Sequence, residues 1–323
     1  MLLPEIRNWK HWGEIFTNEE IWLPIVKAIC SNEGICFDNI RAGYPGTNAV
    51  FILDNKYVIK IYPERCHKDY EHEVEVHKAL QENRKIPIPK VICNGSFQDR
   101  IVWPYMIMEY KYGKAIRDIR DKISHENLMD IYKDLGEIVK EIHNTSSIKL
   151  EQMGTSNINW IKFVNNREKN YIKNNKGISR LSNTAKIKIP SLIRQWFENN
   201  KDSSLNLVNG DLTEDHLLLE FKNSKWQISS IIDLADSLIG QKEYEWVPLW
   251  FGLINRNKLG METFMNAYDS NTALDEEFRE KAMVFTFLHQ FGEEIIDETL
   301  EKLGVSNVET IDELKDILWP NFK

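Results

Sequence analysis

The spacing of apolar residues changes near Gly113, and this change constrains the fold more than any other feature of the sequence. Before it, short β-rich runs lie at Ile35–Ala42, Ala49–Leu53, Tyr57–Tyr62, Ile86–Cys93 and Ile101–Tyr110. A helical stretch, Lys68–Asn83, interrupts these runs, and another, Thr17–Cys30, precedes them. The run with two prolines, Ile86–Cys93, is expected at a sheet edge, because proline cannot donate to an interior ladder. These patterns predict a small antiparallel sheet with one inserted helix.

After Gly113 the pattern is mainly helical. Apolar residues form one helical stripe from Leu128 to Ile142, and Ser191–Asn199 is expected to be a further helix. Three β-rich runs lie among the helices, at Leu205–Val208, His216–Phe221 and Gln227–Ile232. A sheet followed by helices that carry a β-hairpin predicts an α+β protein of two lobes, residues 1–110 and 111–323, with a cleft between them.

The composition restricts the class of protein. With 323 residues, of which 42% are hydrophobic and 28% charged, the chain has ample material for two lobes. No run approaches the ~20 apolar residues of a membrane helix, and a net charge of −8 does not attract nucleic acid or anionic lipid. Four cysteines without a CxxC pair indicate neither a disulfide framework nor a zinc site. We expect a cytoplasmic protein that binds neither membranes nor nucleic acid; its oligomeric state stays open.

A lysine lies inside an apolar β-rich run, where Lys60 is flanked by isoleucines. An ammonium group is costly to bury unless a carboxylate pairs with it. Glu73, on the helix that follows, is the natural partner. An exposed strand face would accommodate Lys60 equally well, so both interpretations stay open.

Two aspartates follow apolar runs in the second half of the chain. Asp211 lies in a turn assisted by Gly210, and Asp233 ends the last β-rich run. A carboxylate placed like Asp211 can orient or accept the proton of an attacking hydroxyl, and one placed like Asp233 can hold a metal that bridges phosphates. His216 returns to the same place at the start of the hairpin. Aspartates that only cap turns are the alternative.

The loop between the first two β-rich runs is a candidate phosphate-binding loop. It contains Gly43, Tyr44, Pro45, Gly46, Thr47 and Asn48. Glycines let the backbone approach phosphate oxygens, and amide hydrogens in such a loop can bind anions. A simple Pro-Gly hairpin is the alternative for this segment.

With these residues in this order, the chain from Ile35 to Trp250 resembles the aminoglycoside phosphotransferase and choline kinase superfamily. The resemblance implies a two-lobed protein-kinase-like fold. It places the family's phosphate loop on Gly43–Asn48 and its nucleotide lysine on Lys60, held by Glu73. ATP is the implied phosphoryl donor, with GTP as an alternative.

The same resemblance assigns the remaining site residues. The Glu109 carbonyl and the Lys111 amide would bind adenine at the joint between the lobes. Asp211 would be the catalytic carboxylate, and Asp233, with His216, would hold Mg²⁺.

The chain departs from the family pattern at three positions. Asn209 stands where the family usually has a histidine that braces the catalytic loop, and His216 stands where a metal-binding asparagine is usual. The Asp-His-Leu sequence at 215–217 resembles hygromycin-type members. Because imidazole suits manganese better than magnesium, Mn²⁺ is an alternative metal. Glu245 replaces an aspartate whose role in the family is structural.

The expected function is therefore ATP-dependent phosphorylation of a small molecule that carries hydroxyl and amino groups, with an aminoglycoside antibiotic as the leading candidate. The resemblance implies an acid-lined pocket for such an acceptor, and four acids flank the catalytic loop: Glu214, Asp215, Asp236 and Glu243. Plain surface charges are the alternative for these acids, and the more common one. A choline-like amine or a sugar metabolite is an alternative acceptor, and a nucleotide-binding pseudokinase that regulates a partner is an alternative function. A protein kinase is disfavoured because its Asp-Phe-Gly and Ala-Pro-Glu motifs are missing.

Overall fold

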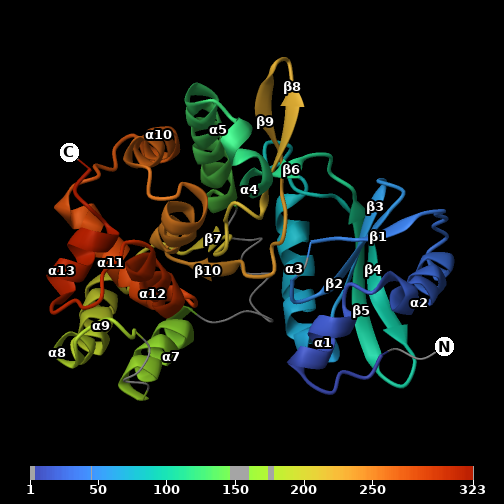
Figure 1. The fold of residues 1–323 in the computed structure, drawn as a ribbon, viewed down its shortest axis with the longest axis horizontal. Helices are drawn as coiled ribbons and strands as arrows, with labels where there is room; N and C mark the ends of the chain where they lie inside the picture. Colours follow the sequence, from blue (N-terminus) through green and yellow to red (C-terminus); the bar gives the residue numbers. More distant parts are fainter. Residues whose placement is uncertain (1–3, 45, 146–159, 174–177, 323) are drawn as a thin grey trace.

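The computed structural model describes residues 4–44, 46–145, 160–173 and 178–322, and these form two lobes (Figure 1). The sheet lobe consists of helices α1 (Trp9–Ile15), α2 (Glu19–Asn32) and α3 (His67–Leu80) and strands β1 (Ile40–Ala42), β2 (Ala49–Leu53), β3 (Tyr57–Ile61), β4 (Val91–Gln98) and β5 (Val102–Glu109). The strands form one antiparallel sheet in the order β1-β2-β3-β5-β4. This is the sheet that the sequence predicts.

Helices cover both faces of this sheet. Trp12 of α1 and Trp22 of α2 pack on Trp103 of β5, with ring centroids 5.7 and 5.4 Å apart. Side chains alternate along a strand, so Met106 points to the other face, where it packs with Val74 of α3. The helix α3 therefore lies against the sheet on the side that faces the helical lobe (Figure 1).

Two strands of the sheet differ from the prediction. Only Ile40–Ala42 of the predicted run Ile35–Ala42 pairs as a strand. The edge strand predicted at Ile86–Cys93 is at the edge, but it begins at Val91, after the prolines, and continues to Gln98. This strand contains Gly95. Any larger residue at that position would place its Cβ 2.8 Å from the hydroxyl of Tyr105.

The helical lobe contains helices α4 (Ile116–Ile119), α5 (His125–His143), α7 (Trp160–Lys173), α8 (Asn183–Lys186), α9 (Ile189–Asn200), α10 (Lys258–Asp269), α11 (Glu276–Leu288), α12 (Gly292–Lys302) and α13 (Ile311–Leu318). Its strands are β6 (Lys114–Ala115), β7 (Asn206–Val208), β8 (Leu217–Lys222), β9 (Lys225–Ile231) and β10 (Leu238–Gly240). The β8–β9 hairpin projects from the lobe beside α5, and β6 pairs with β8 (Figure 1). A turn of 3₁₀-helix lies at Lys242–Glu245, and a turn of π-helix follows at Pro248–Leu253.

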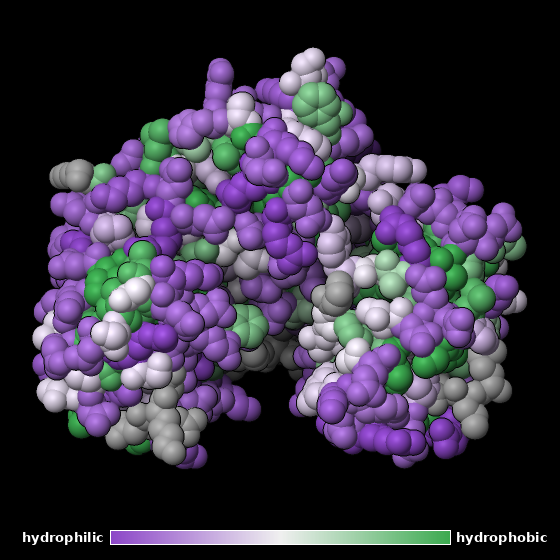
Figure 2. Space-filling view, in the orientation of Figure 1, coloured by the Kyte–Doolittle hydropathy of each residue, from purple (hydrophilic) through white to green (hydrophobic). Residues whose placement is uncertain are grey.

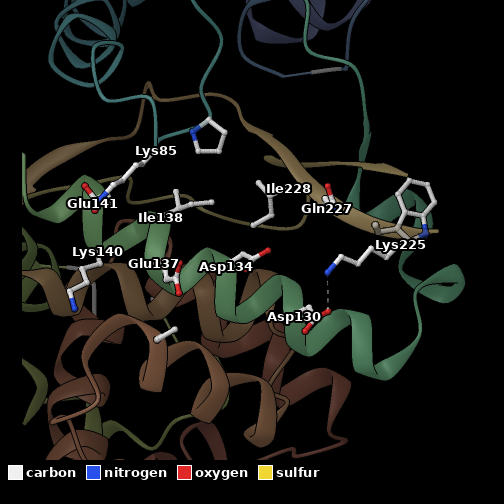
Figure 3. A pocket seen from close by; sticks show the side chains of 13 residues that line it. Lys85, Asp130, Asp134, Glu137, Ile138, Lys140, Glu141, Lys225, Gln227 and Ile228 are labelled. Atoms are coloured by element: carbon white, nitrogen blue, oxygen red, sulfur yellow. Dashed lines mark hydrogen bonds and ion pairs between the residues drawn. The ribbon is translucent and has the colours of Figure 1, made fainter. Parts of the chain in front are cut away.

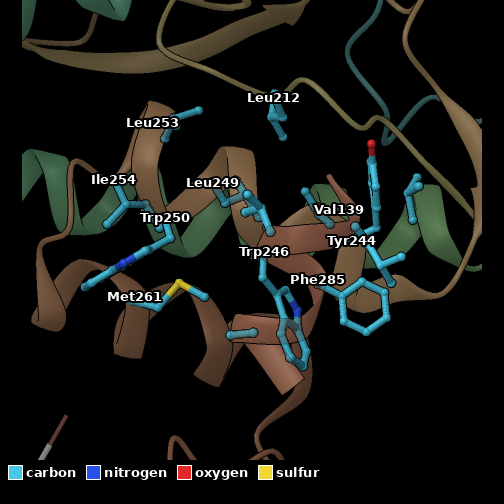
Figure 4. Packing of buried hydrophobic residues seen from close by; sticks show 14 of the residues in the cluster. Val139, Leu212, Tyr244, Trp246, Leu249, Trp250, Leu253, Ile254, Met261 and Phe285 are labelled. Carbon is cyan, nitrogen blue, oxygen red and sulfur yellow. The ribbon is translucent and has the colours of Figure 1, made fainter. Parts of the chain in front are cut away.

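An aromatic core lies beneath the turn that follows β7 (Figure 4). Leu212, Tyr244 and Trp250 are fully buried in it, and Trp246 is 3% exposed. Burial of such large rings provides much of the free energy that holds a lobe together. Because Leu212 belongs to this core, the residue before it, Asp211, is held at the edge of a rigid body.

The two lobes meet at Gly113. This residue has φ 149°, and a Cβ there would lie 2.7 Å from Ser229 Oγ, so glycine is required. The next residue, Lys114, pairs with Leu219 of β8. The molecular surface is hollowed between the lobes (Figure 2). The predicted α+β fold of a sheet lobe and a helical lobe is thus confirmed. None of the described helices is long and apolar enough to cross a membrane.

Candidate active site

Lys60 is the central cation of the cleft. It lies on β3, is 5% exposed, and its Nζ is 3.0 and 2.8 Å from the two carboxylate oxygens of Glu73 on α3. The same Nζ donates to Oδ1 of Asp233 at 2.8 Å, so it links the two lobes. Tyr62, two residues further along, donates its hydroxyl to Glu73 at 2.7 Å. The interpretation of Lys60 as a lysine on an exposed strand face is therefore wrong.

The charges in this cluster stabilise one another. Burial lowers the pKa of Lys60, but the carboxylates of Asp233 and Glu73 outweigh burial and raise it, so the ammonium stays charged. Burial raises the pKa of Asp233, but the charge of Lys60 outweighs it, and the pKa falls to about 2. Asp233 also has φ 60°, a left-handed conformation that non-glycine residues rarely adopt. Such backbone outliers cluster at functional sites.

The turn that carries Asp211 is fixed through its backbone. The amide of Asn209 donates to Glu245 Oε2 at 2.6 Å, and the amide of Asp211 donates to Asn209 Oδ1 at 3.0 Å. Gly210 has φ 77°, and a Cβ there would be 2.7 Å from the carbonyl oxygen of Asp236. Asn209 and Glu245, two of the three residues that differ from the family pattern, thus both bind the backbone of this turn.

His216 lies between the two aspartates. Its Nδ1 is 2.7 Å from the carbonyl oxygen of Asp211, which can only accept, so Nδ1 carries a hydrogen. Its Nε2 is 4.0 Å from Oδ2 of Asp233, and in a neutral ring this nitrogen would present a lone pair. The carboxylate of Asp211 is 3.5 Å from Nδ1. The structure therefore brings Asp211, His216 and Asp233 together in front of Lys60.

The loop expected to bind phosphate connects β1 and β2. Pro45 lies outside the described residues; the amide of Gly43 donates to the Val50 carbonyl at 2.8 Å, which closes the hairpin. Trp12 of α1 donates its indole N–H to the Thr47 carbonyl at 2.9 Å. A Cβ added at Gly46 would meet no atom within 4 Å, whereas Asn48 is only 7% exposed.

The joint residues Glu109 and Lys111 lie at the end of β5. The carboxylate of Glu109 accepts from the amide of Lys90 at 2.9 Å and pairs with Lys111 Nζ at 2.5 Å. The amide of Tyr110 donates to the Lys56 carbonyl at 2.8 Å. The side chain of Glu109 thus stabilises the connection between the lobes. The predicted contact of Glu109 with adenine involves only the backbone carbonyl of this residue.

Two of the four acids expected to line an acceptor pocket are already paired, which corrects the sequence-based expectation. Glu214 is 3.2 Å from Arg120 Nε, and Asp215 is 2.6 Å from Arg117 Nη1. Neither is a free carboxylate for a cationic acceptor. The sequence pattern missed this pairing because both arginines come from the segment around α4, far from the loop in the chain.

A metal ion would find two donors from the chain at this place, Oδ2 of Asp233 and Nε2 of His216. No group of three or more histidine, cysteine, aspartate or glutamate side chains that could enclose a metal occurs in the described part of the chain. Magnesium in nucleotide sites is commonly held by one or two protein groups, with phosphate oxygens and water completing the shell. The donor set fits that arrangement, and its imidazole fits Mn²⁺ better than Mg²⁺.

A cavity of about 840 Å³ lies away from this site, between α5 and β9 (Figure 3). Lys225 pairs with Asp130 across it at 3.5 Å, and Lys85 pairs with Glu141 at 2.7 Å. Its lining residues include none of the predicted site residues. The chemistry therefore belongs to the cleft between the lobes, not to this cavity.

Sequence reasoning missed two contributors to the site. Tyr62 could have been predicted from the sequence, because residues two apart on an extended strand share a face, which places Tyr62 beside Lys60. His289, at the end of α11, donates from Nε2 to the carbonyl of Gly210 at 2.9 Å. It lies in no motif, so its sequence context offered no signal.

Comparison with known proteins supports a kinase of small molecules. The model of the APH family, described as the phosphotransferase enzyme family, matches residues 39–278. A curated relative, the probable acyl-CoA dehydrogenase IBR3 of Arabidopsis thaliana, is 23% identical over 217 residues. That match covers 62% of this chain but only 26% of the Arabidopsis protein.

Solved aminoglycoside phosphotransferases have a similar fold. The GDP complex of wild-type aminoglycoside 2′-phosphotransferase-IIIa matches with a TM-score of 0.68 and 16% identity, over 91% of this chain and 97% of that chain. A thermostable APH(4)-Ia mutant with ADP and hygromycin B matches with a TM-score of 0.60 and 14% identity, over 90% and 97%. The protein-kinase-like fold is thereby confirmed. The hygromycin-type branch is not singled out.

Proposed function

Because the chain belongs to the phosphotransferase enzyme family, we propose that it transfers the γ-phosphoryl group of ATP to a hydroxyl of a small molecule bound in the cleft. The observation that carries this proposal is the convergence of Lys60, Glu73 and Asp233 from both lobes, with Asp211 beside them. GTP is the alternative donor; neighbours of similar fold were solved with GDP, ADP or ATP.

The proposed reaction gives each of these groups a role. Lys60, oriented by Glu73, binds the α- and β-phosphates. Asp211 orients the acceptor hydroxyl and takes up its proton as the acceptor oxygen bonds to the γ-phosphorus and the bond to the ADP oxygen breaks. A magnesium or manganese ion held by Asp233 and His216 would neutralise charge on the phosphate oxygens. Most of the rate enhancement then comes from positioning and electrostatics.

Turnover should rise with pH through about 7. Burial raises the pKa of Asp211 to about 7; His216 opposes this shift, while Asp236 and Asp233 add to it. Only the ionised carboxylate can accept a proton, so kcat/KM for the acceptor should fall as the pH drops below this value. A bound divalent cation favours the carboxylate, so the midpoint in kcat should lie at lower pH. A kcat/KM profile that is flat across the neutral range would contradict this role of Asp211.

Metal preference should depend on His216. A neutral imidazole is a better ligand for Mn²⁺ than for Mg²⁺, so we expect the wild-type protein to tolerate or favour manganese. His216→Asn offers an oxygen ligand and should restore a preference for magnesium. The measurements are turnover and nucleotide-dependent thermal stabilisation with each metal. Unchanged metal preference in both measurements would make His216 a structural residue.

The acceptor that we favour is a polyhydroxylated cation, with an aminoglycoside-type antibiotic as the leading candidate. The net charge of −8 supports a cation, and neighbours of similar fold were solved with kanamycin, gentamicin or hygromycin B. With Glu214 and Asp215 held by arginines, Asp236 and Glu243 are the remaining acids of the expected set. Charge-assisted hydrogen bonds to such acids contribute about 1.5–3 kcal/mol each.

The test is ATP turnover with kanamycin, gentamicin, hygromycin B, choline and neutral sugars, together with inhibitory concentrations in a sensitive bacterium that expresses the protein. An aminoglycoside acceptor should raise turnover, and its KM should increase with salt because screening weakens the ionic contacts. Phosphorylation of a neutral sugar but of no amine would contradict the acceptor while supporting the kinase. Nucleotide binding without turnover of any acceptor would favour the pseudokinase.

A further inference from the structure

One peptide unit in the catalytic turn is held at both of its polar atoms. The amide of Asp211 donates to Asn209 Oδ1 at 3.0 Å, and the carbonyl of Gly210 accepts from His289 Nε2 at 2.9 Å. The peptide unit is planar, so these two bonds fix the orientation of the plane from which the Asp211 side chain departs. Gly210 has no Cβ to restrict rotation of that plane. The two hydrogen bonds therefore limit the rotation of this peptide plane, which the side chain of a residue other than glycine would otherwise limit.

The ring of His289 is itself fixed. It is 1% exposed and stacks on Tyr244, with ring centroids 4.7 Å apart and planes at 26°. Its Nδ1 accepts from the amide of Phe291 at 3.3 Å, and its Nε2 faces a carbonyl, so the neutral ring carries its hydrogen on Nε2. Burial lowers the pKa of His289 to about 4, so the ring is neutral near pH 7. This histidine is a fixed donor and cannot act as a proton carrier at that pH.

The next residue makes a matching contact with the second aspartate loop. The side chain of Gln290 donates to Oδ1 of Asp236 at 2.8 Å. Asp236 lies three residues after Asp233, on the same loop. Its own amide donates to the hydroxyl of Tyr244 at 3.0 Å. Two consecutive residues after α11 therefore hold the turn of Asp211 and the loop of Asp233.

We propose that His289 and Gln290 are positioning residues for phosphoryl transfer: they set the orientation of Asp211 relative to Asp233 through hydrogen bonds to the turn and the loop that carry these aspartates. This inference rests on the proposed function and extends it to a pair outside the matched family segment of residues 39–278. Neither side chain needs to touch nucleotide or acceptor. Their effect should therefore appear in kcat and not in nucleotide binding.

The decisive variant is His289→Phe, which keeps a ring against Tyr244 and removes the donor to Gly210. Misplacement of a catalytic group by about 1 Å can reduce the rate about 10²-fold, so we expect kcat to fall about 10- to 100-fold. The nucleotide KM should stay within about threefold, because the interactions lost act in the transition state and not in nucleotide binding. His289→Gln restores an N–H donor and should recover most of the loss. Gln290→Met should lower kcat in the same direction.

The control is Thr286→Val on the same helix. Thr286 is fully buried and accepts from the indole of Trp319 at 2.9 Å, so this variant loses a buried hydrogen bond away from Gly210. It should melt at a lower temperature with unchanged kcat. Suppose that the wild-type protein is active. The positioning role alone is then overturned if the His289→Phe and Gln290→Met variants keep full kcat. It is also overturned if kcat of His289→Gln is no higher than that of His289→Phe. A wild-type protein inactive on every acceptor would overturn the proposed function, and the positioning role with it.

Discussion

Replacement of Asp211 by asparagine should reduce turnover by about 10²–10⁴ while Mg-nucleotide binding stays nearly intact, because a positioned acid–base group contributes on that scale. The amide keeps the size of the side chain but cannot take a proton. Burial raises the pKa of Asp211 to about 7, so ionisation of this residue costs the folded state free energy as the pH rises toward that value. Above it, Asp211→Asn should melt at no lower temperature than the wild-type protein.

The measurements are steady-state turnover, nucleotide-dependent thermal shift and melting temperature above pH 7. Asp130→Asn is a suitable control, because Asp130 is an exposed carboxylate on α5 that pairs with Lys225 at 3.5 Å, away from the cleft. It should leave all three quantities close to those of the wild-type protein. Full turnover by Asp211→Asn would exclude this residue as the catalytic carboxylate.

Replacement of Lys60 by methionine should abolish nucleotide binding and also destabilise the fold. Glu73 is 1% exposed, and among the described residues it would keep the hydroxyl of Tyr62 as its hydrogen-bond partner. Removal of one member of a buried pair lowers the free energy of unfolding by about 3–5 kcal/mol. Binding of nucleotide at a hundredfold excess over Kd stabilises the wild-type protein by about 2.7 kcal/mol, and this stabilisation should disappear.

Lys85→Met is the matched control, because Lys85 pairs with Glu141 at 2.7 Å on the surface, where such a pair contributes about 0–1 kcal/mol. The double variant Lys60→Met with Glu73→Gln should regain part of the lost stability, since it removes the unpaired charge, but should still bind no nucleotide. Unfolding in urea, with and without Mg-ATP, gives both quantities. A Lys60→Met variant with wild-type nucleotide stabilisation would contradict the assignment of Lys60.

Local patterns in the sequence were enough to predict the two lobes and the order of the site residues. Alternation of apolar residues around Lys60 and the turns before Asp211 and after Asp233 are properties of short segments, because side-chain direction and turn formation depend on neighbouring residues. Other features of local origin were misplaced or missed. The edge strand β4 was placed too early, because its prolines were counted within it, and α1 (Trp9–Ile15) was not predicted, although Asn8 caps it.

The tertiary structure decided which charges meet. Lys60 and Asp233 are 173 positions apart in the chain, and Gly210 and His289 are 79 apart, so no periodicity or motif links them. The same packing placed Arg120 against Glu214 and Arg117 against Asp215, acids that in the sequence look free to bind a cation. The order of residues is enough to identify the side chains with the chemistry of phosphoryl transfer and to assign each of them to a strand or turn. Which of them pair, and which stay available to a ligand, depends on packing within the helical lobe as well as between the two lobes, because an ion pair or a hydrogen bond depends on distances in space that the order of residues does not specify.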